Sequence, residues 1–162
     1  MAILEILTSQ NPVLRKTSKP VAKVTKEVRE LVANMEETLR AAPGIGLAAP
    51  QVGELIRVII ADIGDGLHVL INPKIAKKSG TQTFIEGCLS LPGIEAPVVR
   101  ANKVLVKAMD INGKRIQVEA QDLLATVFQH EIDHLDGKLF VDRVPDPNLI
   151  TYKLKIPKEE SI

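Results

Sequence analysis

Residues 129–134 read QHEIDH and lie in a predicted helix from Asp122 to about Asp136. Because an α-helix has 3.6 residues per turn, His130 and His134 project from the same side and can bind one ion. Glu131 follows the first histidine directly and therefore flanks that ion. Two histidines at this spacing, with a glutamate between them, are typical of a metal centre in which the glutamate transfers protons. The stretch thus predicts a metal-dependent hydrolase.

The alternative interpretation is an amphipathic helix in which both histidines are incidental. Leu123 and Val127 lie on the same stripe as the two histidines, so the predicted ion would sit at the edge of the apolar core. The third histidine of the chain, His68, falls in a strand pattern with no acidic or thiol neighbour, and we interpret it as a surface or core residue. Two of three histidines at ligand spacing favour the metal centre.

A third ligand has to come from outside this helix. One large group of zinc peptidases carries a further histidine six residues after the second one; Gly137 fits that pattern, but Phe140 occupies the histidine position. Glu159 and Glu160 lie in a proline-flanked tail and are poor candidates. Cys88 is favoured, because a thiolate binds divalent transition metals. Two imidazoles and one thiolate leave a fourth position open, as in catalytic sites.

Residues 44–51 read GIGLAAPQ. Gly44 and Gly46 indicate either a positive φ or close backbone contact. Phosphate-binding glycine loops do not fit, because Ala49 stands where a third glycine is needed and no Lys-Ser/Thr pair follows. Gln51 ends the stretch with a neutral amide, which can point at developing negative charge without pairing permanently with it.

Composition limits the class of protein. Hydrophobic residues make up 45% and charged residues 25% of the 162 residues, so we expect one soluble catalytic domain over 1–162, with 146–162 as a short strand-like tail. A net charge of +1 and 2% aromatic residues argue against sequence-specific nucleic-acid binding. No signal-peptide pattern or run of 18 apolar residues is present, so we expect no membrane contact. The single cysteine favours a reducing compartment, the cytoplasm.

Helix signals are clearest near the start and near the end of the chain. Apolar residues at helical spacing predict a first helix from Thr25 to Arg40, with Thr25 as its N-cap and Pro43-Gly44 beyond its end. Gly137 suits the C-terminal cap of the helix that carries the two histidines.

The middle of the chain has the pattern of short strands. Asn112-Gly113 between two alternating segments predicts a hairpin, and Pro92-Gly93 predicts a turn. The predicted strands cover residues 57–62, 67–71, 104–108, 116–120 and 150–156. The expected class is α+β: short, mostly antiparallel strands packed around a central metal-binding helix, with a second helix near the N-terminus.

Three motifs together resemble the peptide deformylase family. They are GIGLAAPQ at 44–51, EGCLS at 86–90 and QHEIDH at 129–134, in the family's order. The segments NPVLR at 11–15 and GKLF at 137–140 are also similar, so the resemblance covers roughly residues 3–145. It implies a hydrolase that removes the formyl group from the N-terminal formyl-methionine of new bacterial or organellar polypeptides and releases formate. Nascent N-formylmethionyl polypeptides are then its partners.

The resemblance also implies a ligand set. Cys88, His130 and His134 would bind one divalent metal ion, with water in the fourth position. In the family this ion is usually Fe²⁺, and Zn²⁺, Ni²⁺ or Co²⁺ can substitute. Thiolate and imidazole suit several metals, so the residues alone do not select iron.

The implied catalytic residues are Glu131, Gln51 and Leu89. Glu131 would transfer the proton, while the Gln51 amide and the Leu89 backbone N–H would hold the oxyanion. We expect the formyl-methionine end of the substrate to be bound by Gly44, Ile45, Gly46, Phe84, Gly87, Leu123 and Val127.

Some features depart from the family. Glu95 falls near the place where some members carry an arginine that contacts the substrate backbone, and the resemblance implies that Arg100 pairs with Glu86. The short tail lacks the basic helix by which some members dock on the ribosome, so ribosome docking stays open. Two rivals also stay open: a metallopeptidase that cleaves internal bonds, and a non-catalytic relative that binds metal or formyl-peptide.

Overall fold

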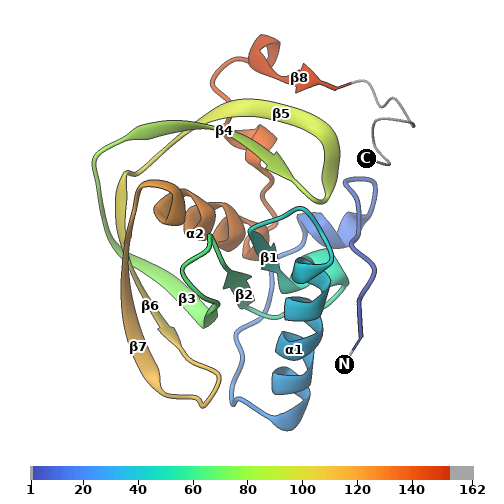
Figure 1. The fold of residues 1–162 in the computed structure, drawn as a ribbon, viewed down its shortest axis with the longest axis vertical. Coiled ribbons are helices and arrows are strands. Elements are labelled where there is room, and N and C mark those ends of the chain that lie inside the picture. The colour runs from blue at the N-terminus through green and yellow to red at the C-terminus, as the bar shows by residue number, and fades with distance from the viewer. Residues whose placement is uncertain (1, 154–162) are drawn as a thin grey trace.

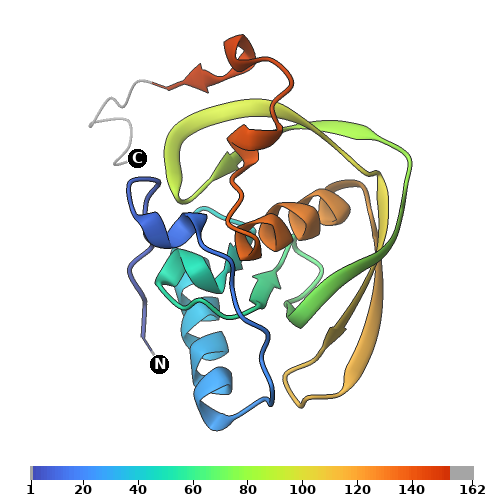
Figure 2. The ribbon, with the colours of Figure 1, turned by 180° about the vertical axis from the view of Figure 1, so that it is seen from behind.

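The central element of the fold is α2 (Asp122–Leu135), which the two sheets enclose (Figures 1 and 2). The computed structural model describes residues 2–153. Every residue of α2 from Leu124 to Leu135 is buried. A helix buried all round cannot rely on a polar outer face, so its polar side chains need partners inside the protein. No helix among the described residues is long and apolar enough to cross a membrane.

One sheet has five antiparallel strands in the order β1-β2-β3-β6-β7. Its second strand, β2, is buried on both faces. Ile59 and Ala61 pack with residues of α2, whereas Val58 and Ile60 pack with residues of α1 (Lys26–Arg40). The strands are β1 (Gly46–Ala48), β2 (Val58–Ala61), β3 (His68–Ser79), β6 (Lys103–Met109) and β7 (Arg115–Gln121).

The other sheet covers α2 from the opposite side and has three strands, in the order β4-β5-β8. They are β4 (Gln82–Cys88), β5 (Leu91–Arg100) and β8 (Thr151–Tyr152). Four short 3₁₀ helices complete the described chain: η1 (Pro12–Arg15), η2 (Ala49–Val52), η3 (Phe140–Arg143) and η4 (Pro147–Leu149).

The expected α+β class is confirmed, and so are several local details. Thr25 caps α1, where its side chain accepts a hydrogen bond from Val28 N at 3.3 Å. Gly113 has a φ of 80° in the turn between β6 and β7. Gly137 follows the end of α2 with a φ of 72°, the left-handed conformation that a helix C-terminus commonly requires.

Other expectations were wrong. Pro92-Gly93 does not form the turn, because it lies inside β5 and the chain reverses between Cys88 and Leu91, which face each other in the sheet. Neither β4 nor β5 is evident in the sequence, since their glycines and prolines interrupt the alternation of apolar residues. Strand β3 runs on to Ser79, well past the predicted 67–71, because its second half pairs with β6. Of the predicted strand 150–156, only Thr151–Tyr152 is a strand within the described residues; 154–156 lie outside them.

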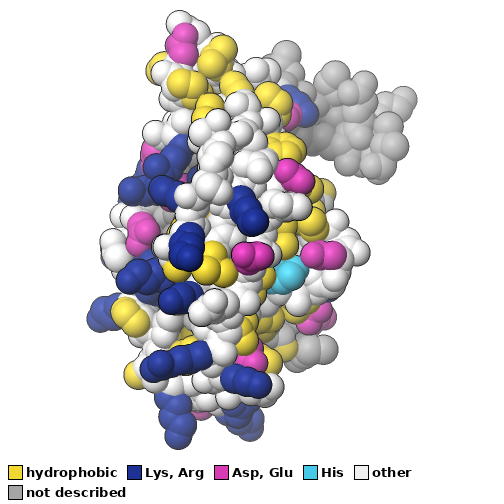
Figure 3. Space-filling model, turned by 90° about the vertical axis from the view of Figure 1, so that its left-hand side faces the viewer, with side chains coloured by type: hydrophobic (Ala, Val, Ile, Leu, Met, Phe, Trp, Pro, Cys, Tyr) yellow, Lys and Arg dark blue, Asp and Glu magenta, His cyan; other side chains and the backbone are white. Residues whose placement is uncertain are grey.

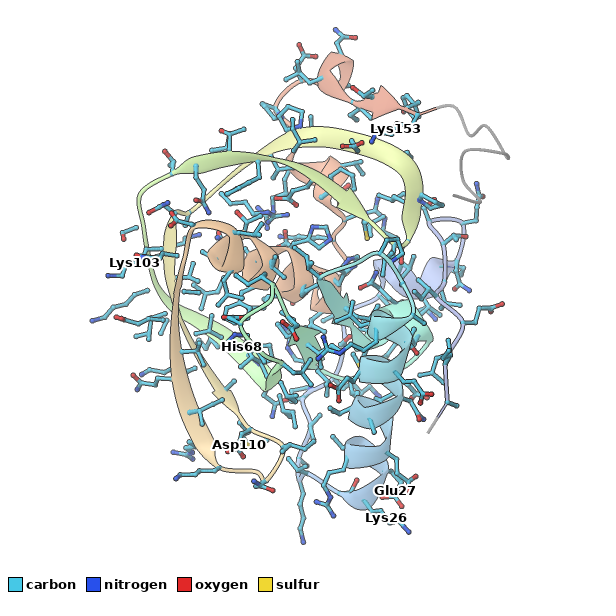
Figure 4. The ribbon with its side chains drawn as sticks, viewed as in Figure 1. Lys26, Glu27, His68, Lys103, Asp110 and Lys153 are labelled. Atoms are coloured by element: carbon cyan, nitrogen blue, oxygen red, sulfur yellow. The ribbon has the colours of Figure 1, made fainter. Side chains whose placement is uncertain are left out.

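The outer face of β3, β6 and β7 is basic. Lysine and arginine side chains gather there in the space-filling view (Figure 3), and Lys103 projects away from the sheet (Figure 4). Lys74 lies directly opposite Lys107 in the pairing of β3 with β6. Like charges at directly opposite positions are destabilising, so this pair does not contribute to the stability of the sheet.

We predict that Gly137→Ala destabilises the fold more than Gly113→Ala. Both glycines have a positive φ, but a Cβ at Gly137 would lie 2.5 Å from the Arg15 carbonyl oxygen, whereas at Gly113 it would meet only Val24 at 3.8 Å. Backbone strain alone costs about 1–2 kcal/mol, and the clash adds to it at Gly137 only. Urea unfolding measures both variants; equal losses of unfolding free energy would contradict the prediction.

Candidate metal centre

Two elements bring Cys88, His130 and His134 together. Cys88 ends β4, and both histidines lie on the face of α2 that this strand covers. One potential ligand atom from each residue lies within 4.8 Å of the other two. The Cys88 Sγ to His134 Nε2 distance is 3.4 Å, close to the separation of about 3.5 Å that two tetrahedral ligands of one zinc ion would have. These three residues therefore fit a divalent metal ion.

The ring of His130 is oriented by Glu86. Its Nδ1 lies 2.7 Å from Glu86 Oε1, and a carboxylate only accepts, so Nδ1 donates and Nε2 is left for an ion. Arg100 holds Glu86 in turn: its Nε donates to Oε2 at 2.6 Å and its second terminal nitrogen to Oε1 at 3.0 Å. The pairing of Arg100 with Glu86, which only the resemblance implied, is thus confirmed.

The local charge favours a cation at His130. Burial alone would lower the pKa of this ring, but Cys88, Glu131 and Glu86 outweigh burial and raise that pKa to about 10. For His134, burial and the charge of His130 lower the pKa well below its usual range. A metal ion bound by both rings would supply the positive charge that the acidic surroundings favour. Both histidines would then stay neutral, so that two protonated rings would not lie side by side.

Glu131 has the properties of a proton acceptor. Burial, together with Glu86 and Asp133, raises the pKa of Glu131 to about 7, against the opposing charges of His130 and Arg100. Its Oε1 is buried without a hydrogen-bond partner among the described residues. A buried carboxylate that titrates near neutrality suits general acid–base work.

Gly46 makes room for Glu131. A Cβ at Gly46 would lie 2.5 Å from Glu131 Oε2 and 2.9 Å from Val127 Cγ1. Gly46 does not have a positive φ, and neither does Gly44, where a Cβ would lie 2.8 Å from Leu89 Cδ1. Of the two interpretations of these glycines, close contact is right and unusual backbone conformation is wrong. Gly87 differs, since a Cβ there would meet ordinary contacts at 3.6 Å and beyond.

Gln51 is held by hydrogen bonds at both ends of its amide. Its Oε1 accepts from Ala48 N at 2.9 Å, and its Nε2 donates to Ser90 Oγ at 3.1 Å and lies 3.6 Å from Cys88 Sγ. The side chain is 1% exposed. These partners fix which end of the amide is the donor and direct it towards the cysteine.

A pocket of about 740 Å³ lies over these groups. Every predicted catalytic and substrate-binding residue lines it, together with Cys88 and His130; His134 is buried and does not line it. Sequence reasoning did not find Ile85 and Ile94 of the second sheet, nor Lys153, which follows β8 (Figure 4). No motif marks these three residues, which only the pairing of β4, β5 and β8 brings to the pocket.

His68 lies away from the cluster, at the start of β3 (Figure 4). Its ring packs edge-on against Phe128, and its Nε2 lies 3.1 Å from Asp65 Oδ2. The expectation that His68 has no acidic neighbour was therefore wrong, because the turn before β3 returns Asp65 to the ring. The interpretation of His68 as a surface or core residue outside the metal centre agrees with its position, and its side chain is 25% exposed.

The fold and the site define a class: an α+β protein in which one cysteine and two histidines converge as a candidate metal centre, next to a buried glutamate. Comparison with known proteins identifies the family. Residues 3–149 match the family model described as polypeptide deformylase. A peptide deformylase from Carboxydothermus hydrogenoformans is 47% identical over 143 residues, which are 88% of this chain and 94% of that protein.

Solved structures of peptide deformylases superpose closely on this chain. The peptide deformylase of Thermotoga maritima superposes with a TM-score of 0.87 at 39% identity, over 89% of this chain and 99% of that one. The peptide deformylase from Synechococcus elongatus, in complex with actinonin, superposes with a TM-score of 0.86 at 42% identity, over 88% of this chain and 79% of that one. This chain belongs to the peptide deformylase family. It is a metal-dependent hydrolase that removes the N-formyl group from newly synthesised polypeptides.

We predict that Gly46→Ala lowers the deformylation rate about 10²-fold, because the added methyl group displaces the Glu131 carboxylate. Gly87→Ala is the comparison in the same pocket, and we expect a much smaller loss there because its Cβ meets no close contact. Steady-state kinetics of both variants, with circular dichroism to verify folding, test the difference. Equal losses would mean that the Gly46 contact is not what positions Glu131.

Proposed function

We propose that Cys88, His130 and His134 hold one divalent metal ion and that Glu131, Gln51 and Leu89 carry the reaction with it. The single observation that carries this proposal is the convergence of these three ligand atoms within 4.8 Å beneath the pocket. We expect the resident ion to be Fe²⁺, and Zn²⁺, Ni²⁺ or Co²⁺ can substitute for it. When bound, the ion lowers the pKa of the attacking water and polarises the formyl oxygen.

Glu131 acts as the general base and then as the general acid. It accepts a proton from water as the water oxygen attacks the formyl carbon, and it later passes that proton to the departing amine nitrogen. The C–N bond breaks, and formate and a free N-terminal methionine are the products. Two properties of Glu131 support this role: its Oε1 has no hydrogen-bond partner among residues 2–153, and its pKa is raised to about 7.

The oxyanion that forms in between is stabilised by two donors of the chain, the Nε2 of Gln51 and the backbone N–H of Leu89. Gln51 Nε2 lies 3.6 Å from Cys88 Sγ, and Leu89 follows the cysteine directly. The fixed orientation of the Gln51 amide supports the first donor, because a donor that is already in place needs no reorganisation during the reaction.

The apolar part of the pocket suits a methionine side chain. Ile45, Phe84, Leu123 and Val127 supply apolar walls, and Gly44, Gly46 and Gly87 line the part of the pocket where the formyl end would bind. Leu89 and Glu131 already fill the space beside Gly44 and Gly46, which supports discrimination against acetyl, a group larger than formyl by one methyl group. The fit of side chain to pocket then selects N-terminal methionine.

The decisive experiment measures formate release from formyl-Met-Ala-Ser under anaerobic conditions, with the protein loaded with Fe²⁺ or Ni²⁺. We expect steady release; none above buffer would refute the proposal, and cleavage of casein would revive the metallopeptidase rival. Glu131→Ala should keep one equivalent of metal and lose about 10²–10⁴ in rate. Cys88→Ala should lose the metal, and Glu30→Ala on the surface of α1 is the control. If Cys88→Ala retained one equivalent, the ligand set would be wrong.

We also propose that the protein works in the cytoplasm, close to the ribosome from which its substrates emerge. The basic outer face of β3, β6 and β7 supports this position, because ribosomal RNA is a polyanion.

In low salt, Lys74→Glu/Lys107→Glu should therefore reduce co-sedimentation with ribosomes. The control is Lys16→Glu/Lys26→Glu, which changes the net charge equally on other surfaces. Equal effects of the two double variants would refute a specific role for this face.

A further inference from the structure

His130 is contacted by η3 as well as by Glu86. The ring of Phe140, the first residue of η3, stacks on the ring of His130 with centroids 5.9 Å apart and an interplanar angle of 20°. Phe140 is 1% exposed. The position that would hold a third histidine ligand in one group of zinc peptidases thus holds an aromatic ring that packs on a ligand.

The last residue of η3 reaches the same histidine through a chain of ion pairs. Arg143 donates to both carboxylate oxygens of Asp133, at 2.9 and 2.8 Å. Asp133 Oδ2 also accepts from Arg100, at 3.0 Å. Arg100 then holds Glu86 through two hydrogen bonds, and Glu86 accepts from His130 Nδ1.

The charges along this chain alternate and cancel. Glu86 and Asp133 are acidic, and Arg100 and Arg143 are basic. The side chains of Arg100, Glu86 and Asp133 are 3%, 5% and 11% exposed, whereas that of Arg143 is 42% exposed. Arg143 is therefore the outer cation that balances two carboxylates buried beside the metal centre. A buried carboxylate that loses its partner is costly, so the balance matters.

We propose that η3 positions His130 for metal binding, with Phe140 fixing the plane of the ring and Arg143 fixing Glu86 through Asp133 and Arg100. This inference rests on the proposed role of His130 as a ligand. Phe140 and Arg143 are positioning residues, and neither lines the pocket.

The role of Arg143 follows from competition between two carboxylates for one guanidinium. While Arg143 pairs with both oxygens of Asp133, Arg100 gives Asp133 only one terminal nitrogen and pairs side-on with Glu86 through its other two nitrogens. Without Arg143, the only remaining basic partner of Asp133 among the described residues is Arg100. Arg100 is then drawn towards Asp133, and its hydrogen bonds to Glu86 weaken. The ring of His130 would then be less well oriented for the ion.

The backbone of η3 does not depend on Arg143. Its Asp142 accepts from Leu139 N at 3.0 Å, and Arg15 of η1 pairs with the same carboxylate. A substitution at the half-exposed Arg143 therefore leaves η3 anchored, which makes it a suitable site for a test.

The test measures Co²⁺ affinity of the metal-free protein by competition with a chromophoric chelator, together with the visible spectrum of the Co²⁺ form. We expect Arg143→Gln to weaken binding about tenfold and to change the cobalt bands, with Arg143→Lys in between because a lysine cannot pair with both oxygens. Phe140→Leu should alter the spectrum as well. Arg29→Gln, on the outer surface of α1, should match the wild type in both measurements.

A double variant separates charge balance from general damage. Arg143→Gln/Asp133→Asn removes one charge of each sign, so it should bind Co²⁺ more tightly than Arg143→Gln alone. Wild-type affinity and spectrum in Arg143→Gln, or additive losses in the double variant, would overturn the inference and leave the proposed function intact. Failure of the wild type itself to bind one equivalent would instead refute the proposed ligand set.

Discussion

The structure depends on the burial of a helix in which five of six successive residues, 129–134, have polar side chains. Gln129, His130, Glu131, Asp133 and His134 are all buried on α2. Taking such groups out of water is unfavourable unless each finds a partner, and removing one member of a buried ion pair costs about 3–5 kcal/mol. The rest of the fold supplies these partners. The second sheet supplies Glu86 and Arg100, and η3 supplies Arg143.

The arrangement of β4 and β5 follows from this requirement. Their antiparallel pairing places Glu86 and Arg100 close together, so that one arginine reaches Glu86 and Asp133 at once. Beyond the end of β5, the backbone of Ala101 donates to and accepts from the Gln129 amide, at 3.1 and 2.9 Å. The strand that ends in Cys88 thus also carries Glu86, which orients His130, one of the histidines with which the cysteine is proposed to share an ion.

Two buried polar atoms of α2 lack a partner among the described residues, Glu131 Oε1 and His134 Nδ1. Both belong to the cluster at which chemistry is proposed. Around them, Gly46 leaves only enough space for the Glu131 carboxylate, and Ser90 and Ala48 hold the Gln51 amide. The site is therefore rigid where it binds and orients groups, and it retains an unsatisfied carboxylate where a proton is transferred. This division is the usual mark of a preorganised active site.

The sequence by itself determined the two helices, the β6–β7 hairpin, the shared side of His130 and His134, and the family, because each depends on local spacing or short motifs. The helical repeat alone sets His130 and His134 on one side, and Asn112-Gly113 specifies a turn wherever it stands. Only the tertiary structure decided which distant groups meet. It revealed β4 and β5, whose glycines and prolines hide their alternation, and it reversed the chain at 89–90 instead of at Pro92-Gly93. It also stacked Phe140 on His130 and joined Arg143 to Glu86 through Asp133 and Arg100. The contacts of Arg100 depend on the pairing of β4 with β5, and those of Phe140 and Arg143 depend on the path of the chain after α2. No local pattern encodes either.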